Sequence, residues 1–229
     1  MRVVHILCEY LKDRIKLFIF DLDGTLIDTS DRFYNVFIFL AEKYGLQKIT
    51  RAEFKQLYKS NRLGEILLQV KQRFLPEFLR IYHDFKGECE KPFEGVVEAL
   101  KILKCRKYLL SVVTGRIIDS ELVRFELEKH GLKDLFDEVL ANNLSASSKG
   151  EESLQKTNSF KFLIERFNLK PEECVVVGDY VTDIISGKRL GCWTIGVLSG
   201  GLDYNILKSV NPDFIIASVK DIPSLLKLL

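Results

Sequence analysis

Two carboxylates one residue apart are the first feature of this chain that suggests chemistry. Asp21 and Asp23 follow an apolar run at residues 17–20, in the stretch KLFIFDLDGTLIDTS. Alternate residues of an extended chain face the same side, so both acids can address one reacting centre if Leu22 turns into the core. Beside a bound Mg²⁺, one carboxylate can attack phosphorus to give an aspartyl-phosphate, while the other protonates the leaving oxygen and later deprotonates water. Gly24 permits a tight turn and a close approach of the backbone to a phosphate.

Two further apolar runs also end in polar side chains. Thr114, followed by Gly115, ends YLLSVVT, and Asp179 ends CVVVGD with Asp183 four residues later. Ligands of an open parallel sheet bind beyond the carboxyl ends of its strands, so these groups and the first two acids converge if the strands point the same way. So much negative charge is costly without a cation, and hard oxygen ligands favour Mg²⁺, which shares its coordination with a substrate phosphate. We therefore expect a Mg²⁺ site that takes a small phosphorylated metabolite.

Short apolar runs alternate with helical patterns along most of the chain, and these elements must position the acids. Strands are expected at residues 17–20, 108–114, 174–179, 193–197 and 213–217, and helices at 95–105, 119–131, 159–169 and 183–191. This alternation favours an α/β fold with a parallel sheet that is covered on both faces.

One part of the chain breaks this alternation. It shows aromatic residues at helical spacing, and helices are expected at roughly 31–44, 51–60, 63–73 and 76–86. The predicted architecture is a Rossmann-like α/β core domain, residues 1–29 and 91–229, with an inserted all-helical domain at 30–90. Residues 142–153 are expected to form a loop, and residues 1–15 receive no role.

The bulk composition limits the possible partners and the compartment. The 229 residues carry a net charge of +2, from 34 basic and 32 acidic side chains, which supports neither a nucleic-acid nor a membrane-surface partner. No apolar run approaches the roughly 18 residues of a membrane span. The five cysteines are scattered and contain no CxxC pair, which is typical of free thiols in a reducing compartment. We expect a cytoplasmic protein, either a monomer or a homodimer.

The segments DLDGTLIDT, VVTGR and VVVGDYVTD resemble motifs of the haloacid dehalogenase superfamily, in particular its phosphatases with a helical cap. The resemblance covers nearly the whole chain. It implies that Asp21 is the nucleophile and a metal ligand, that Asp23 is the general acid/base with its main-chain oxygen on the metal, and that Thr114 hydrogen-bonds the transferring phosphoryl group. It also implies that Asp179 binds Mg²⁺ and that Asp183 lies at the metal or directly behind its ligands. A charge at a helix N-terminus is the alternative role for Asp183.

The same family uses a lysine before its GD strand, usually in a Lys-Pro context that this sequence lacks. Lys156 in LQKTNSFKFL is the predicted counterpart, just before an expected helix start at Asn158 or Ser159. Lys149 and Lys161 are its rivals.

The second acid also bears on the choice of reaction within this family. A halide leaving group needs no proton, so Asp23 disfavours dehalogenation and favours phosphoryl transfer. With water as the acceptor, the expected activity is that of a phosphatase acting on a phosphoglycolate-like acid, a sugar phosphate or a nucleotide. A β-phosphoglucomutase-like phosphomutase is an alternative, and so is a non-catalytic binding protein, although an intact set of acids disfavours the latter.

Two arginines are candidate substrate contacts. Arg62 in KSNRLGEIL offers a planar fork that suits a substrate carboxylate or phosphate, and its alternative role is a solvated charge at a helix end. Arg116 in TGR is expected either to reach the phosphate or to pair with Asp119 on the surface.

Overall fold

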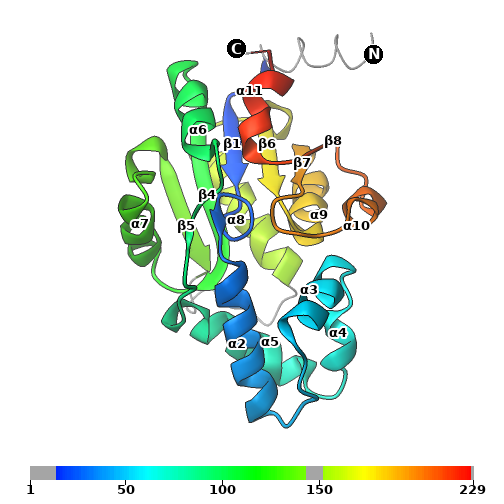
Figure 1. The fold of residues 1–229 in the computed structure, drawn as a ribbon. Helices are drawn as coiled ribbons and strands as arrows, with labels where there is room; N and C mark the ends of the chain where they lie inside the picture. The colour runs from blue at the N-terminus through cyan, green and yellow to red at the C-terminus, as the bar shows by residue number, and fades with distance from the viewer. Residues whose placement is uncertain (1–13, 143–151, 228–229) are drawn as a thin grey trace.

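The protein is described by a computed structural model that covers residues 14–142 and 152–227. Its centre is a parallel six-stranded sheet in the order β5-β4-β1-β6-β7-β8 (Figure 1). The strands are β1 (Leu17–Phe20), β4 (Leu109–Ile117), β5 (Glu138–Asn142), β6 (Cys174–Gly178), β7 (Trp193–Val197) and β8 (Phe214–Ile216). The chain adds β4 and β5 on one side of β1 before it crosses to β6 on the other side. Residues that follow β1 and β6 and the last residues of β4 therefore meet at one edge, where the strand order reverses.

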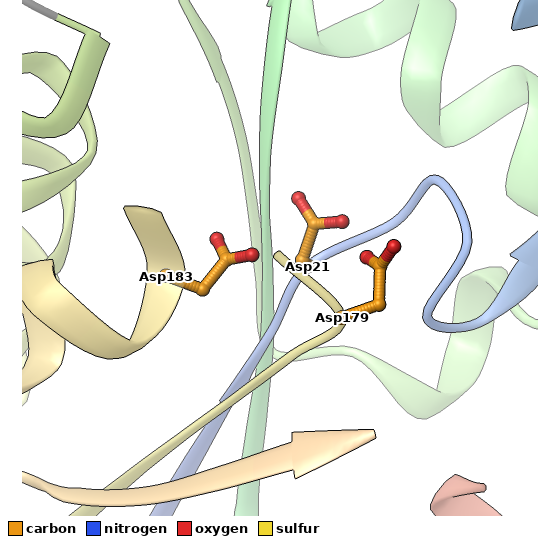
Figure 2. A group of neighbouring side chains, drawn as sticks. All are labelled: Asp21, Asp179 and Asp183. Carbon is orange, nitrogen blue, oxygen red and sulfur yellow. The ribbon is translucent and has the colours of Figure 1, made fainter. Parts of the chain in front are cut away.

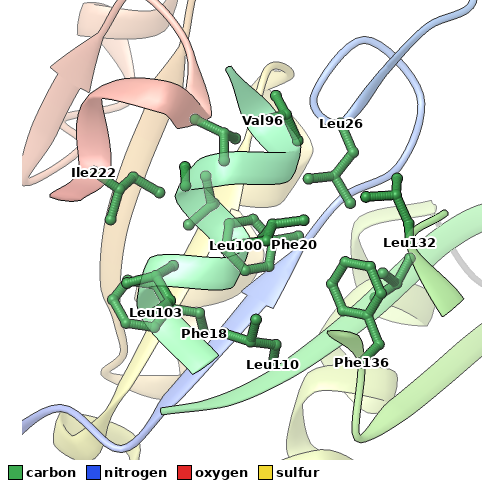
Figure 3. Packing of buried hydrophobic residues seen from close by; sticks show 14 of the residues in the cluster. Phe18, Phe20, Leu26, Val96, Leu100, Leu103, Leu110, Leu132, Phe136 and Ile222 are labelled. Atoms are coloured by element: carbon green, nitrogen blue, oxygen red, sulfur yellow. The ribbon is translucent and has the colours of Figure 1, made fainter. Parts of the chain in front are cut away.

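Helices cover both faces of the sheet. Successive side chains of a strand point to opposite faces, so the apolar residues of one strand pack against helices on both sides. Phe18 and Phe20 of β1 pack with Leu100 of α6 and Ile222 of α11 (Figure 3). Leu17, also on β1, faces the other side and packs with residues of α8. The helices of the core are α6 (Val96–Cys105), α7 (Ser120–Lys129), α8 (Glu152–Arg166), α9 (Val181–Leu190), α10 (Tyr204–Ser209) and α11 (Ile222–Leu225), with short 3₁₀ turns η2 (Lys133–Leu135), η4 (Pro171–Glu173) and η5 (Val219–Asp221).

A group of helices between β2 and β3 lies beyond the ends of β1 and β6 (Figure 1). It consists of α2 (Ser30–Lys43), α3 (Arg51–Lys59), α4 (Leu63–Ile66), α5 (Lys71–Ile81) and the 3₁₀ turn η1 (Tyr82–Asp84). These helices have an apolar cluster of their own, centred on aromatic side chains such as Phe37 and Phe74. The two connections to the sheet lie side by side, since β2 (Ile27–Asp28) pairs antiparallel with β3 (Lys91–Pro92).

The predicted parallel α/β sheet is confirmed, with strands 17–20 and 193–197 as expected and the other three predicted strands shifted by at most three residues at either end. Strand β5 was not predicted, because its apolar run at 139–141 is short and belongs to a half-buried edge strand. The helix expected at 63–73 is wrong: α4 ends at Ile66 and α5 begins at Lys71. No glycine or proline marks that break, so the apolar periodicity runs through it.

The start of α8 also differs from the expectation. This helix begins at Glu152, so Asn158 and Ser159 lie inside it and the predicted cap at those residues is wrong. Of the expected loop at 142–153, Asn142 belongs to β5 and residues 152–153 belong to α8, while residues 143–151 lie outside the described residues.

The expectations of no membrane span and of free cysteines concern the whole chain, part of which the structure describes. Within residues 14–142 and 152–227, no helix is both long and apolar enough to cross a membrane. Cys89, Cys105, Cys174 and Cys192 are free thiols, and Cys8 lies outside the described residues. Residues 1–13, whose role was left open, also lie outside them.

Candidate active site

Three buried aspartates meet at the edge of the sheet where the strand order reverses. Asp21 follows β1, Asp179 follows β6, and Asp183 lies in the first turn of α9. Ligand atoms of all three lie within 4.8 Å of one another, and Figure 2 shows the carboxylates directed to the same side. Thr25 fixes one of them: its hydroxyl donates to Asp179 Oδ1 over 2.9 Å and accepts from the Asp179 amide over 3.1 Å. Thr25 was not singled out as a site residue from the sequence, although its place in the segment DLDGTLIDT was an available signal.

Lys156 connects two of these acids. Its Nζ donates to Asp21 Oδ1 over 2.8 Å and to Asp183 Oδ1 over 2.5 Å, and the side chain is buried. Burial alone lowers the pKa of a lysine, but the two carboxylates reverse that effect and hold the pKa of Lys156 well above its usual value. Its rival Lys161 is exposed and faces Glu165, and Lys149 lies outside the described residues.

The negative charge of this cluster is only partly balanced. Burial raises the pKa of Asp21 well above its usual value, and the charges of Asp183 and Asp179 add to that rise while Lys156 opposes it. Burial raises the pKa of Asp179 to about 7, again with a contribution from Asp183. With formal charges, three carboxylates and one ammonium leave two negative charges. A divalent cation would balance these two charges, and a donor set made of oxygens fits Mg²⁺.

Glycines allow the backbone to pass close to the acids. A Cβ at Gly24, which has a φ of +78°, would lie 2.6 Å from Asp179 Oδ2, and one at Gly178 would lie 2.5 Å from the Asp183 carboxylate. Gly200, in the loop after β7, is closer still, since its Cβ would lie 1.7 Å from Asp179 Oδ2. Gly200 was not predicted as a site residue, although the SGG sequence one residue beyond the strand at 193–197 was an available signal.

Asp23 lies beside this cluster and is held by Arg116. The guanidinium donates from Nε to Asp23 Oδ2 over 2.8 Å and from Nη2 to Oδ1 over 2.5 Å, and Thr114 Oγ1 lies 3.3 Å from Oδ2. The pairing of β4 with β5 shifts register between Thr114 and Ile117, and this irregularity spans Gly115 and Arg116. Burial opposes ionisation of Asp23, but the charge and hydrogen bonds of Arg116 outweigh it and lower the pKa of Asp23 below its usual value.

The surface pair considered for Arg116 is wrong. Arg116 is almost fully buried, at 2% exposure, and its second carboxylate partner is Glu126. Asp119 instead caps helix α7, where it accepts from the amide of Glu121 over 2.9 Å.

The helices at 30–84 bring to the acid cluster a residue other than the predicted Arg62. Arg62 precedes α4, is largely exposed and pairs with Glu65 over 2.8 Å, so the structure does not bring it to the acids. Tyr58 of α3 reaches them instead, with its hydroxyl 3.4 Å from Asp179 Oδ2. Beside it, the Tyr180 hydroxyl donates to Asn61 Oδ1 over 2.7 Å. No pattern in the sequence distinguishes Tyr58 as a site residue, since an aromatic at helical spacing is typical of a helical core.

Comparison with known proteins agrees with this geometry. The model of the haloacid dehalogenase-like hydrolase family matches residues 18–197. The pyrophosphatase PpaX of Halalkalibacterium halodurans is 28% identical over 219 residues, which are 91% of this chain and 95% of that protein.

Solved structures share the fold. A predicted phosphoglycolate phosphatase from Haemophilus somnus 129pt aligns with a TM-score of 0.69 at 24% identity and covers 93% of this chain and 98% of its own. A predicted phosphatase from Clostridium acetobutylicum aligns with a TM-score of 0.76 at 21% identity and covers 94% and 99%.

The chain belongs to the haloacid dehalogenase-like hydrolase family, since the family model spans most of its length. That family is one of hydrolases, and similar proteins carry the names of a pyrophosphatase and of a predicted phosphoglycolate phosphatase.

Proposed function

We propose that this protein is a Mg²⁺-dependent phosphatase that hydrolyses a small phosphomonoester through an aspartyl-phosphate on Asp21. The observation that carries the proposal is the contact of one buried ammonium, Lys156, with both Asp21 and Asp183, while Asp179 completes the acid cluster. A lysine beside the nucleophile offsets the charge of an incoming phosphate, and the acids behind it suit a divalent cation.

The residues that would bind the metal are Asp21, Asp179, Asp183 and, through its main-chain oxygen, Asp23. Bound Mg²⁺ would supply charge neutralisation for the phosphoryl group and the nucleophile. In this proposal, Lys156 remains protonated throughout, which agrees with its raised pKa. Thr114 would hold an oxygen of the phosphoryl group.

The proposed hydrolysis takes place in two steps, formation of the aspartyl-phosphate and its hydrolysis. An oxygen of Asp21 attacks phosphorus, the bond from phosphorus to the leaving oxygen breaks, and Asp23 gives that oxygen a proton. Asp23 then takes a proton from water as the water oxygen attacks phosphorus. The bond to Asp21 breaks, phosphate leaves, and Asp23 is protonated for the next cycle.

The proposed substrate is a phosphoglycolate-like acid, a sugar phosphate or a nucleotide, and the Tyr58 hydroxyl, 3.4 Å from Asp179 Oδ2, lies close to its binding site. The names of two similar proteins, a pyrophosphatase and a predicted phosphoglycolate phosphatase, support a small anionic substrate. We propose that residues 30–90 form a cap over a core of residues 1–29 and 91–229, with substrate contacts from Gly24, Gly115 and Arg62. Arg116, already bonded to Asp23 and Glu126, would act on the substrate through Asp23.

The test is phosphate release from a panel of phosphorylated metabolites and p-nitrophenyl phosphate, with Mg²⁺ and with EDTA. We expect a few substrates whose hydrolysis needs Mg²⁺ and is abolished by Asp21→Asn. Asp134→Asn, at an exposed aspartate of the core, is the matched control and should retain full activity. Activity that persists in Asp21→Asn or in EDTA would contradict the mechanism. A panel without phosphate release, but with conversion of one sugar phosphate to its isomer, would assign the protein as a phosphomutase.

A further inference from the structure

A line of buried and partly buried charged side chains extends from Asp23 away from the acid cluster. Arg116 bonds Asp23 with Nε and Nη2, and it donates from Nη1 to Glu126 Oε2 over 2.6 Å and from Nη2 to Oε1 over 3.2 Å. Glu126 Oε1 also accepts from Arg32 Nη2 over 3.2 Å. Arg32 in turn donates from Nε to Glu90 Oε1 over 2.6 Å and from Nη2 to Oε2 of the same carboxylate. We call these five residues the charge chain.

The charge chain joins parts of the fold that the sequence keeps far apart. Glu126 lies on α7 of the core, Arg32 in the first turn of α2, and Glu90 directly before β3. Arg32 and Glu90 thus stand at the two connections between the sheet and the helices at 30–84. Tyr82, at the end of those helices, places its ring 5.5 Å from the Arg32 guanidinium and 5.4 Å from that of Arg116.

In the proposed reaction, Glu126 has a role in addition to stabilising the fold. Arg116 donates to both oxygens of Asp23, so in the proposed reaction the carboxyl gives up part of this contact when it turns a protonated oxygen to the leaving group. Glu126 is then the carboxylate that still holds Arg116 among the described residues. A buried guanidinium without a charged partner is strongly unfavourable. Glu126 therefore keeps Arg116 in place while Asp23 turns to the substrate, and the fixed guanidinium defines the position to which the Asp23 carboxyl returns.

We propose that Glu126 is a positioning residue for protonation of the leaving group: it anchors Arg116, which sets the place of the Asp23 carboxyl, and Arg32 and Glu90 tie that anchor to the connections of the helical cap. This inference rests on the proposed function, because it assigns Glu126 a role in the same reaction.

The test compares kcat/KM for two substrates that differ in their need for a proton. An alkyl phosphate from the panel has a poor leaving group, whereas p-nitrophenyl phosphate has a good one. Because kcat/KM reports the steps up to departure of the leaving group, later attack by water does not affect it. The Asp23→Asn variant calibrates the signature, with a large loss for the alkyl substrate and a smaller one for p-nitrophenyl phosphate.

We expect Glu126→Gln to show the same signature, with kcat/KM reduced about 10-fold or more for the alkyl phosphate and about 3-fold or less for p-nitrophenyl phosphate. Glu128→Gln, two residues along α7 at an exposed position, is the matched control and should match wild type for both substrates. Glu90→Gln should show a weaker form of the signature, since its carboxylate acts through Arg32.

Equal losses for both substrates in Glu126→Gln, or no loss, would overturn the inference and leave Glu126 as a structural residue. If that variant does not fold, Glu126→Asp, which keeps the charge and shortens the reach, gives the same readout. A wild-type protein inactive on the whole panel would contradict the proposed function instead, so the two failures are distinguishable.

Discussion

Lys156 and Asp183 face one another from neighbouring helices, α8 and α9, with 2.5 Å between Nζ and Oδ1. Both side chains are buried, and the same ammonium also donates to Asp21 Oδ1 over 2.8 Å. One cation is therefore shared between the proposed nucleophile and the proposed metal site. The two sites consequently depend on each other, and this dependence can be measured.

Replacement of Lys156 by Met is expected to affect both activity and stability. Loss of an ammonium beside the reacting phosphate should lower kcat about 100-fold or more. It also leaves the buried carboxylates of Asp21 and Asp183 without a charged partner, which costs on the order of 3–5 kcal/mol of stability when no metal is bound. Differential scanning fluorimetry should therefore show a lower Tm than wild type without metal, and a larger gain in Tm when Mg²⁺ is added. Lys161→Met, on an exposed face of the same helix, should change neither quantity.

Mg²⁺ binding is expected to depend on pH through Asp179. Its pKa is raised to about 7, above the usual value of 3.8, so a proton competes with the metal below about pH 7. Apparent Mg²⁺ affinity should rise with pH, by about 10-fold per unit for one proton, and level off above about pH 7. The raised pKa of Asp21 acts in the same direction.

The stability of the metal-free protein changes with pH in the opposite direction: the contribution of Asp179 falls as the pH rises. Between about pH 4 and 7 the folded state keeps a proton on Asp179 that the unfolded chain has lost. This contribution to stability is complete below about pH 4 and disappears as the pH rises through 7. The gain in Tm on adding Mg²⁺ should thus be larger at pH 8 than at pH 5.5. A Mg²⁺ affinity that is independent of pH, measured by calorimetry, would contradict this prediction.

Gly200→Ala is expected to disrupt the acid cluster. The new Cβ would lie 1.7 Å from Asp179 Oδ2 and 2.4 Å from its Cγ, so either the carboxylate or the loop after β7 must move. Since Asp179 is a proposed metal ligand, we expect a clear loss of Mg²⁺ affinity together with a fall in Tm. Gly64→Ala is the control: a Cβ there meets no atom within 4 Å, and Gly64 lies in helix α4. That variant should keep full affinity and gain about 0.5–1 kcal/mol of stability at most. Unchanged Mg²⁺ affinity in Gly200→Ala would argue against Asp179 as a ligand.

Arg62 can be tested without disturbing the fold. Its guanidinium is largely exposed and its partner Glu65 is on the surface, so Arg62→Ala should leave Tm unchanged. If Arg62 turns from Glu65 to the substrate, as we propose, KM should rise about 10-fold while kcat stays the same, because the lost contact is equal in the ground and transition states. Arg80→Ala, at another exposed arginine of these helices, controls for the change in charge. A KM equal to that of wild type would remove Arg62 from the substrate site.

The short-range pattern of the sequence determined the core of this protein and the identity of its acids. Apolar runs that end in Asp21, Thr114 and Asp179 predicted parallel strands with polar groups at one edge, since the carboxyl ends of such strands meet. The structure brings Asp21, Asp179 and Asp183 together as that reasoning expected, and it brings Lys156 to them although the start of α8 was misplaced.

Only the tertiary structure decided what surrounds those acids. Glu126 is an ordinary glutamate of an amphipathic helix, and its proposed role follows from its contact with the buried Arg116 of β4. Tyr58 reaches Asp179 because the helices at 30–84 fold over the edge of the sheet. Such contacts join residues far apart in the chain, and the periodicity of a sequence carries information about one element at a time. The energy of a buried charge depends instead on which elements pack around it.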